Sequence, residues 1–196
     1  MRNSEIVRKT NETDITLRLN IDGTGKGDID TGVGFLDHML DLFARHGRFD
    51  LEIKCVGDTD IDGHHTVEDI GICLGMAFHE ALGDAAGITR FSDVVMPMDE
   101  ALVLCAIDIS GRNHLELDVE LPDGAVGTMD TELLEEFLLA FVRKAVITVH
   151  IRMLSGKNVH HIIEACFKAL SRALRAALKI DKELGREIPS TKGSIV

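Results

Sequence analysis

The stretch His64-His65-Thr66-Val67-Glu68 decides how this chain is organised, because it recurs 96 positions later as His160-His161-Ile162-Ile163-Glu164. The apolar positions that follow keep the same offset, as Leu74 and Leu170 do. Two segments that share a five-residue signature and then stay in step over further turns indicate an internal duplication. Apolar residues at helical spacing follow each motif, so we expect each motif to begin a helix.

The segments on either side of the two motifs also repeat in order. Alternation of apolar and polar residues indicates strands, and apolar residues at i, i+3 and i+4 indicate helices. In the first half we expect strands over 15–21 and 49–56 and helices over 34–46 and 64–82, and in the second half strands over 103–109, 114–121 and 146–153 and helices over 131–144 and 159–178. The glycines between 23 and 34 indicate turns.

These patterns predict an α+β fold that is duplicated as residues 1–88 and 89–196 within a single compact unit. Each half is expected to be a mixed β-sheet layered against two helices. The length of 196 residues and the hydrophobic content of 45% suffice to bury one substantial core.

The composition limits the classes of protein to which the chain can belong. The formal net charge of -12 argues against a surface that binds nucleic acid or anionic membranes. No apolar run approaches ~20 residues, so no membrane span is expected, and the polar N-terminus lacks the apolar stretch of a signal peptide. The four cysteines form no CxxC pair and are expected to be reduced packing residues. We therefore expect a cytoplasmic protein.

The two motifs have the residue types and spacing of metal ligands. On a helix, residues at i and i+4 share a face, so His64 with Glu68, and His160 with Glu164, can each hold one metal ion. Imidazole beside carboxylate suits manganese, iron or zinc. The second histidine of each doublet is rotated by about 100° and points elsewhere. The alternative is that adjacent histidines merely begin two surface helices, but two copies in register favour ligation.

A duplicated molecule can complete such sites by cross-bracing, in which one half gives the i,i+4 pair and another gives a single histidine. Two metal ions per chain follow, at interfaces between halves of neighbouring subunits. His38, which lies 26 residues before His64, and its repeat counterpart Glu136, which lies 24 residues before His160, are candidate additional ligands.

Three basic segments are candidates for holding an anion. Arg112 follows a turn after an apolar strand, Arg90 lies in the connection between the halves, and 189–193 combines hydroxyls with a cation. A Walker-type GxxxxGK[ST] loop is absent, so any phosphate bound here would belong to a substrate and not to a hydrolysed nucleotide.

Five segments together resemble the imidazole-glycerol-phosphate dehydratase family, and the likeness covers nearly the whole chain. They are Gly34–Leu40, His64–Asp69, Asp108–Arg112, Gly156–Ala165 and Pro189–Gly193. The resemblance implies two halves of like fold, a homo-oligomer of 24 subunits, and two manganese ions per active site shared between subunits. It also implies a hydro-lyase of histidine biosynthesis, which dehydrates imidazole-glycerol phosphate to imidazole-acetol phosphate through an imidazolate bound by both metal ions.

The resemblance further implies roles for individual residues of this chain. One metal ion would be held by His64, Glu68, Glu136 and His161, and the other by His38, His65, His160 and Glu164. The catalytic base would be Glu12, and the substrate phosphate would be bound by Arg90, Arg112, Lys168, Ser190 and Lys192. Many relatives have histidine where this chain has Glu136, which changes the charge of that site.

Two other functions stay open on the residues alone. A dinuclear metallohydrolase of a phosphorylated small molecule would use the same ligands with a metal-bound water as nucleophile. A structural oligomer would use the histidines only to join subunits.

Overall fold

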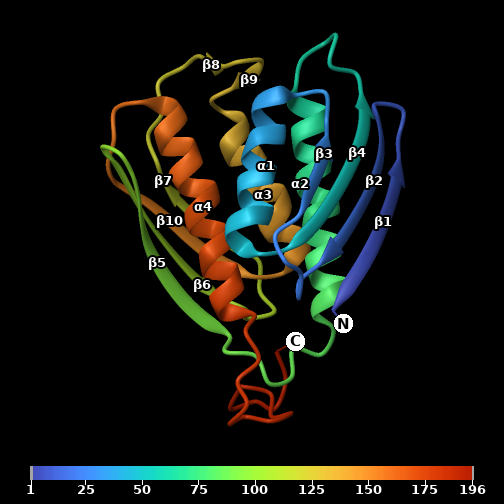
Figure 1. The fold of residues 1–196 in the computed structure, drawn as a ribbon, viewed down its shortest axis with the longest axis vertical. Coiled ribbons are helices and arrows are strands. Elements are labelled where there is room, and N and C mark those ends of the chain that lie inside the picture. Colours follow the sequence, from blue (N-terminus) through green and yellow to red (C-terminus); the bar gives the residue numbers. More distant parts are fainter. Residues whose placement is uncertain (1, 196) are drawn as a thin grey trace.

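The computed structural model describes residues 2–195, and in this part of the chain two four-stranded sheets enclose four helices (Figure 1). The first half contains β1 (Asn3–Lys9), β2 (Thr13–Asn20), β3 (Gly27–Asp30), α1 (Gly34–Gly47), β4 (Asp50–Gly57) and α2 (His64–Leu82). The second half contains β5 (Phe91–Met98), β6 (Ala101–Asp108), β7 (His114–Asp118), β8 (Ala125–Val126), β9 (Met129–Asp130), α3 (Leu133–Ala145), β10 (Thr148–Ser155) and α4 (Val159–Ala177).

The two sheets have the same topology, which confirms the duplication. Their strand orders are β1-β2-β4-β3 and β5-β6-β10-β7. In each sheet the first three strands pair antiparallel, and the fourth pairs parallel with its neighbour. The small β8–β9 hairpin is an addition of the second half, since the described part of the first half has no counterpart to it.

The helices pack across the boundary between the halves, with α1 against α4 and α2 against α3. Gly63 lies against Leu133 and Gly71 against Phe137, so α2 and α3 run in the same direction. A Cβ on Gly71 would lie 2.8 Å from the Phe137 carbonyl oxygen, so the missing side chain allows the two backbones to approach closely. Each interhelical pair therefore takes one helix from each half.

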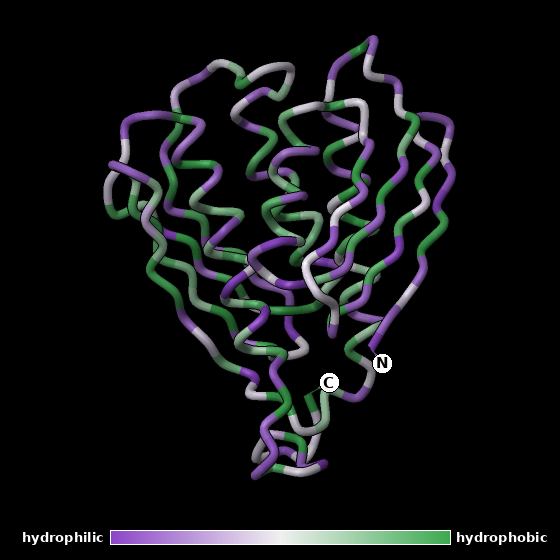
Figure 2. Tube along the Cα trace, in the orientation of Figure 1, coloured by the Kyte–Doolittle hydropathy of each residue, from purple (hydrophilic) through white to green (hydrophobic). Residues whose placement is uncertain are grey.

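The core lies between the sheets and the helices. On β2 and β6 every second residue is buried. Hydrophobic and polar residues alternate along β2, whereas β6 is hydrophobic at every position but the last, as Figure 2 shows. Buried phenylalanines such as Phe43, Phe78 and Phe141 pack edge to face where α1, α2 and α3 meet. This packing holds the C-terminal ends of the three helices together, and the HHxxE motifs lie at the opposite ends, where α2 and α4 begin.

The α+β fold and the helices were predicted well, whereas several strands were not predicted. The helix over 64–82 is confirmed at both ends, and the other three helices begin and end within two residues of expectation. β1, β3 and β5 were not predicted from the sequence, and all three are edge strands. An edge strand buries little: β3 has no buried residue and β1 has only Ile6. The alternation that identifies a strand is therefore weak in them. The division at residue 88 stays a prediction.

Candidate metal centre

The helix pair α1–α4 brings together three of the predicted ligands at the start of α4. Ligand atoms of His38, His160 and Glu164 all lie within 4.8 Å of one another. Glu164 Oε2 is 3.2 Å from His160 Nε2 and 3.6 Å from His38 Nε2. The Phe35 ring packs edge-on against His160, with ring centroids 5.0 Å apart, which limits the rotation of that imidazole. This set of two imidazoles and one carboxylate is the cluster of metal-ligand type found among residues 2–195.

The carboxylate of this cluster is buried, and cations face it. The Glu164 side chain is only 7% exposed, and Lys168 forms an ion pair with it from the next turn of α4. Burial by itself would raise the pKa of Glu164, but the hydrogen bond and charge of Lys168, with His160 and His38, hold that pKa below its usual value. The group is thus an anion in the folded chain, the protonation state that metal ligation needs.

The pair α2–α3 forms the repeat counterpart of this cluster, in a more open arrangement. His64 Nε2 lies 3.9 Å from Glu68 Oε2, and both side chains are about two-fifths exposed. Glu136, which is half-buried, lies on α3 between the two residues that contact the start and the middle of α2. In the repeat, His64 corresponds to His160, Glu68 to Glu164, and Glu136 to His38. Their ligand atoms do not close to the same spacing.

The second histidine of each doublet points away from its own cluster, as the helical rotation predicts. His65 Nδ1 lies 2.8 Å from Asp58 Oδ2, and its Nε2 lies 3.7 Å from Glu12 Oε1. The Asp58 hydrogen bond raises the pKa of His65. In this chain His65 is therefore not joined to His38, and the ligand set that the resemblance implies is not complete within one chain.

His161 repeats this arrangement in the second half. Its Nδ1 lies 2.7 Å from Glu100 Oε2, and its Nε2 lies 3.9 Å from Asp99 Oδ2. The hydrogen bond to Glu100 raises the pKa of His161. The same bond is the largest cause that lowers the pKa of Glu100 to about 2, with backbone N–H groups of Asn158 and Lys157 adding to it. Sequence reasoning missed Glu100 and Asp58.

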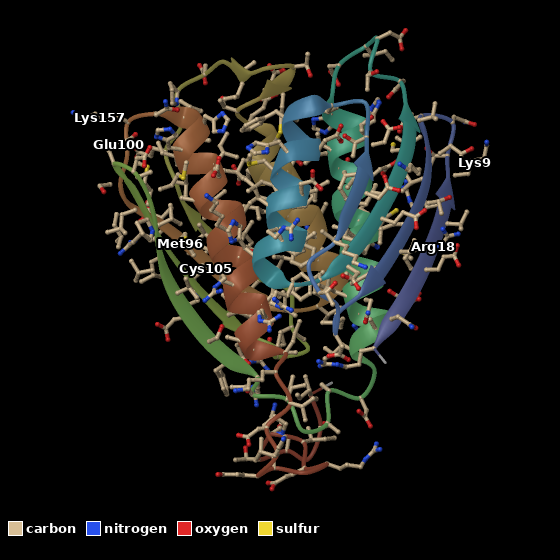
Figure 3. All side chains as sticks on the ribbon, viewed as in Figure 1. Lys9, Arg18, Met96, Glu100, Cys105 and Lys157 are labelled. Carbon is tan, nitrogen blue, oxygen red and sulfur yellow. The ribbon has the colours of Figure 1, made fainter. Side chains whose placement is uncertain are left out.

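A signal for Glu100 was present in the sequence. β2 and β6 correspond at an offset of 88 positions, so Glu100, which precedes β6, is the repeat counterpart of Glu12, which precedes β2. The labelled Glu100 and Lys9 mark the two corresponding hairpins at opposite sides of the molecule (Figure 3). Asp58 has no such signal, because the residue 96 positions later is Leu154.

The predicted phosphate ligands fall into two groups. Asp108 joins Arg90, which lies 2.8 Å from it, to Arg112, which lies 3.9 Å from it. Arg90 also donates a hydrogen bond to the Pro189 carbonyl oxygen, which brings the Ser190–Lys192 segment to the same place. Lys168 lies apart from them, beside Glu164.

The Arg90 cluster lies far along α4 from the metal-ligand cluster that contains Glu164. The Arg90 backbone N–H donates to Ala177 at the end of this helix, whereas Glu164 lies near its start. The intervening helix spans about 20 Å at 1.5 Å per residue. One chain therefore carries a cluster of metal-ligand type at one end of the helices and a cationic cluster at the other.

Fold and site together define a duplicated α+β protein with His/carboxylate clusters at one end of its helices. The family described as imidazoleglycerol-phosphate dehydratase matches residues 31–174. The chain belongs to this family, and its members are hydro-lyases of histidine biosynthesis. No helix in residues 2–195 is long and apolar enough to span a membrane.

Relatives of this family match along the whole chain. An imidazoleglycerol-phosphate dehydratase of Desulforamulus reducens is 57% identical, with 98% of this chain and 97% of the relative covered. That of Azorhizobium caulinodans is 55% identical, with 100% and 99% covered. The crystal structure of the Staphylococcus aureus enzyme superposes with a TM-score of 0.83 at 41% identity, with 91% of this chain and 99% of that chain covered.

Proposed function

We propose that this chain is a manganese-dependent dehydratase that converts imidazole-glycerol phosphate into imidazole-acetol phosphate, with two manganese ions per active site. The observation that carries the proposal is the closed cluster of His38, His160 and Glu164, with its more open repeat counterpart on α2 and α3. Two imidazoles and a carboxylate suit manganese by ligand type. Its partners hold the carboxylate as an anion, and Lys168 forms an ion pair with it.

The proposal includes sites that are shared between subunits. Each cluster offers three candidate ligands, and the remaining histidine of each doublet contacts carboxylates outside its own cluster. The start of α2 and the start of α4 lie on opposite sides of α1 and α3 (Figure 1), so one chain does not bring the two doublets together. Docking the α2 end of one subunit onto the α4 end of another would give His65 to the second chain and His161 to the first. A head-to-tail contact forms a closed oligomer when its rotation closes, and we propose a closed assembly of 24 subunits.

The phosphate ligands argue for a further contribution from a neighbour. A substrate of this kind is roughly 10 Å long from ring to phosphate, by standard bond lengths. It cannot span the distance of about 20 Å along α4 between Glu164 and the Arg90 cluster. We therefore propose that Arg90, Arg112, Ser190 and Lys192 bind the phosphate at an active site whose metal ligands belong to other chains, whereas Lys168 binds it beside its own cluster.

Glu12 is our candidate for the base. When bound, the two metal ions would act as Lewis acids on the ring nitrogens and draw electrons from the substrate ring. Glu12 would then accept the carbon-bound proton, while the phosphate ligands hold the chain of the substrate in line. Its side chain is 52% exposed and lies beside His65, and its backbone carbonyl accepts a hydrogen bond from Asp58 N–H. The hairpin thus holds an exposed carboxylate next to a candidate metal ligand.

Product analysis tests this function against the two alternatives. The protein is loaded with manganese and incubated with imidazole-glycerol phosphate, and products are identified by mass spectrometry while inorganic phosphate is assayed. We expect loss of one water, a new ketone and no free phosphate. Release of phosphate would favour the metallohydrolase, and no turnover with metal bound would favour the structural oligomer.

A further inference from the structure

Glu100 lies where a carboxylate can control a metal ligand without touching the metal. Its Oε2 lies 2.7 Å from His161 Nδ1, and its Oε1 accepts hydrogen bonds from the backbone N–H groups of Asn158 and Lys157 at 2.7 and 3.2 Å. Glu100 is in the β5–β6 hairpin, and the labelled Glu100 and Lys157 lie side by side at the end of the sheet where α4 begins (Figure 3). One carboxylate therefore ties that hairpin to both the backbone and the imidazole at the start of α4.

This geometry determines which nitrogen of His161 carries the proton. An ionised carboxylate can only accept, so Nδ1 must donate, and in the neutral ring Nε2 is then left with its lone pair. Only that lone pair can ligate a metal, and metal-bound histidines commonly donate their other N–H to a carboxylate. Nε2 of His161 lies 3.9 Å from Asp99 Oδ2, and His161 is not part of the His38, His160 and Glu164 cluster.

We propose that Glu100 is a positioning residue, which holds His161 in the orientation and tautomer that present Nε2 to a metal ion of a neighbouring subunit. The inference rests on the proposed function, since it assigns a role toward the same metal ions. The other half supports it independently: Asp58 holds His65 Nδ1 at 2.8 Å in the same manner. The two carboxylates come from different elements, so the shared arrangement is not a copied feature.

The two hairpin carboxylates contact different nitrogens of their histidines, although they occupy corresponding positions of the repeat. Glu12 and Glu100 occupy corresponding positions, but Glu12 lies on the Nε2 side of its histidine, whereas Glu100 binds Nδ1. Because Asp58 already holds His65, Glu12 is left free of that task. The same duplicated position thus serves chemistry in one half and positioning in the other.

The substitution Glu100→Gln tests the inference with little change of shape. In this variant the two backbone N–H groups should keep the side-chain oxygen as their acceptor, so the amide NH₂ would face His161 Nδ1. An NH₂ group donates to Nδ1 and so favours the tautomer in which Nε2 carries the proton. The matched control is Glu116→Gln, which changes an exposed carboxylate 3.8 Å from His114 on the strand β7. The oligomeric protein is titrated with Mn²⁺ alone by calorimetry, and bound manganese is counted by elemental analysis.

We expect wild type and Glu116→Gln to bind two manganese ions per chain with equal affinities. In Glu100→Gln one class of site should weaken by about 10–100-fold while the other is unchanged. The melting temperature of the metal-free protein should fall only slightly, because the backbone contacts keep an oxygen acceptor and only the partly exposed contact to His161 is lost.

Equal affinity of Glu100→Gln and wild type at both sites would overturn the positioning role, even if the wild-type protein dehydrates its substrate. Failure of wild type to bind manganese would instead refute the proposed function. If Glu100→Gln does not fold, Glu100→Ala provides the second variant, and it must weaken one class of site selectively for the inference to stand.

Discussion

Replacing Lys168 by methionine should destabilise the metal-free protein much more than the manganese-loaded one. The Lys168 side chain is 15% exposed and the Glu164 side chain 7%, so the substitution leaves a buried carboxylate without its lysine. Methionine keeps most of the apolar stem, so the change removes mainly charge. Removing one partner of a buried ion pair typically costs about 3–5 kcal/mol.

The neighbouring histidines reduce this cost, and bound metal should remove most of it. His160 Nε2 and His38 Nε2 lie 3.2 and 3.6 Å from the Glu164 carboxylate, so it keeps polar partners when the lysine is removed. We therefore expect a loss of about 2–3 kcal/mol in the free energy of unfolding without metal. A drop of about 4–12 °C in melting temperature corresponds to this loss. A manganese ion beside Glu164 supplies the missing positive charge, so the loss should fall below about 1 kcal/mol.

The assay is thermal unfolding of wild type and Lys168→Met, each with chelator and with manganese. Lys54→Met is the matched control, because Lys54 pairs with Asp28 at 2.8 Å while both side chains are about half exposed or more. That surface pair should contribute less than about 1 kcal/mol in either condition. The same drop for Lys168→Met with and without manganese would refute the reasoning, because it would mean that no metal ion compensates Glu164.

Three further predictions concern the other ligand cluster, the substrate contacts and the thiols. Glu136→Ala should lose about one manganese ion per chain by elemental analysis, whereas Glu136→His should retain it, since imidazole is also a manganese ligand; full metal content in Glu136→Ala would exclude Glu136 as a ligand. Lys192→Ala should lower kcat/KM by one to two decades, about 1.5–3 kcal/mol, with unchanged metal content, whereas Glu12→Gln should bind substrate normally and lose turnover. Steady-state kinetics with calorimetry separates these two effects. Retained turnover in Glu12→Gln would mean that another group is the base. Burial raises the pKa of Cys55 to about 12 and that of Cys73 to about 11, so at pH 8 neither is a thiolate. Native protein should then leave a disulfide-exchange reagent unreacted until denaturant is added, and rapid labelling of either thiol would contradict their burial.

The fold could be predicted from the sequence mainly because of the repeat. Duplicated apolar positions placed the helices, since a helix with one buried face carries its period in the sequence. The edge strands β1, β3 and β5 could not be found in this way. Their residues are mostly exposed or half-buried, so the sequence shows no clear alternation of apolar and polar residues there.

The parts of the candidate site that depend on spacing within one helix were predicted from the sequence. The i,i+4 pairs of both doublets lie as expected, and His38 joins His160 and Glu164. Glu100 and Asp58 were not predicted, because their contacts to the histidines come from a hairpin and a loop whose approach depends on the whole fold. The long separation between Lys168 and the Arg90 cluster likewise follows only from the direction of α4.

The central claim is that the active site is completed between subunits, and complementation of two inactive variants tests it most directly. His65→Asn damages the ligand given by the α2 end of a chain, and Glu164→Gln damages the cluster at its α4 end. The two chains are co-expressed with different tags, and mixed oligomers are purified by both tags. If sites form between chains, random mixing gives about a quarter of them both intact parts, so about a quarter of wild-type activity should return. If every ligand of a site comes from one chain, no site is intact, and mixed oligomers as inactive as either variant alone would contradict the account.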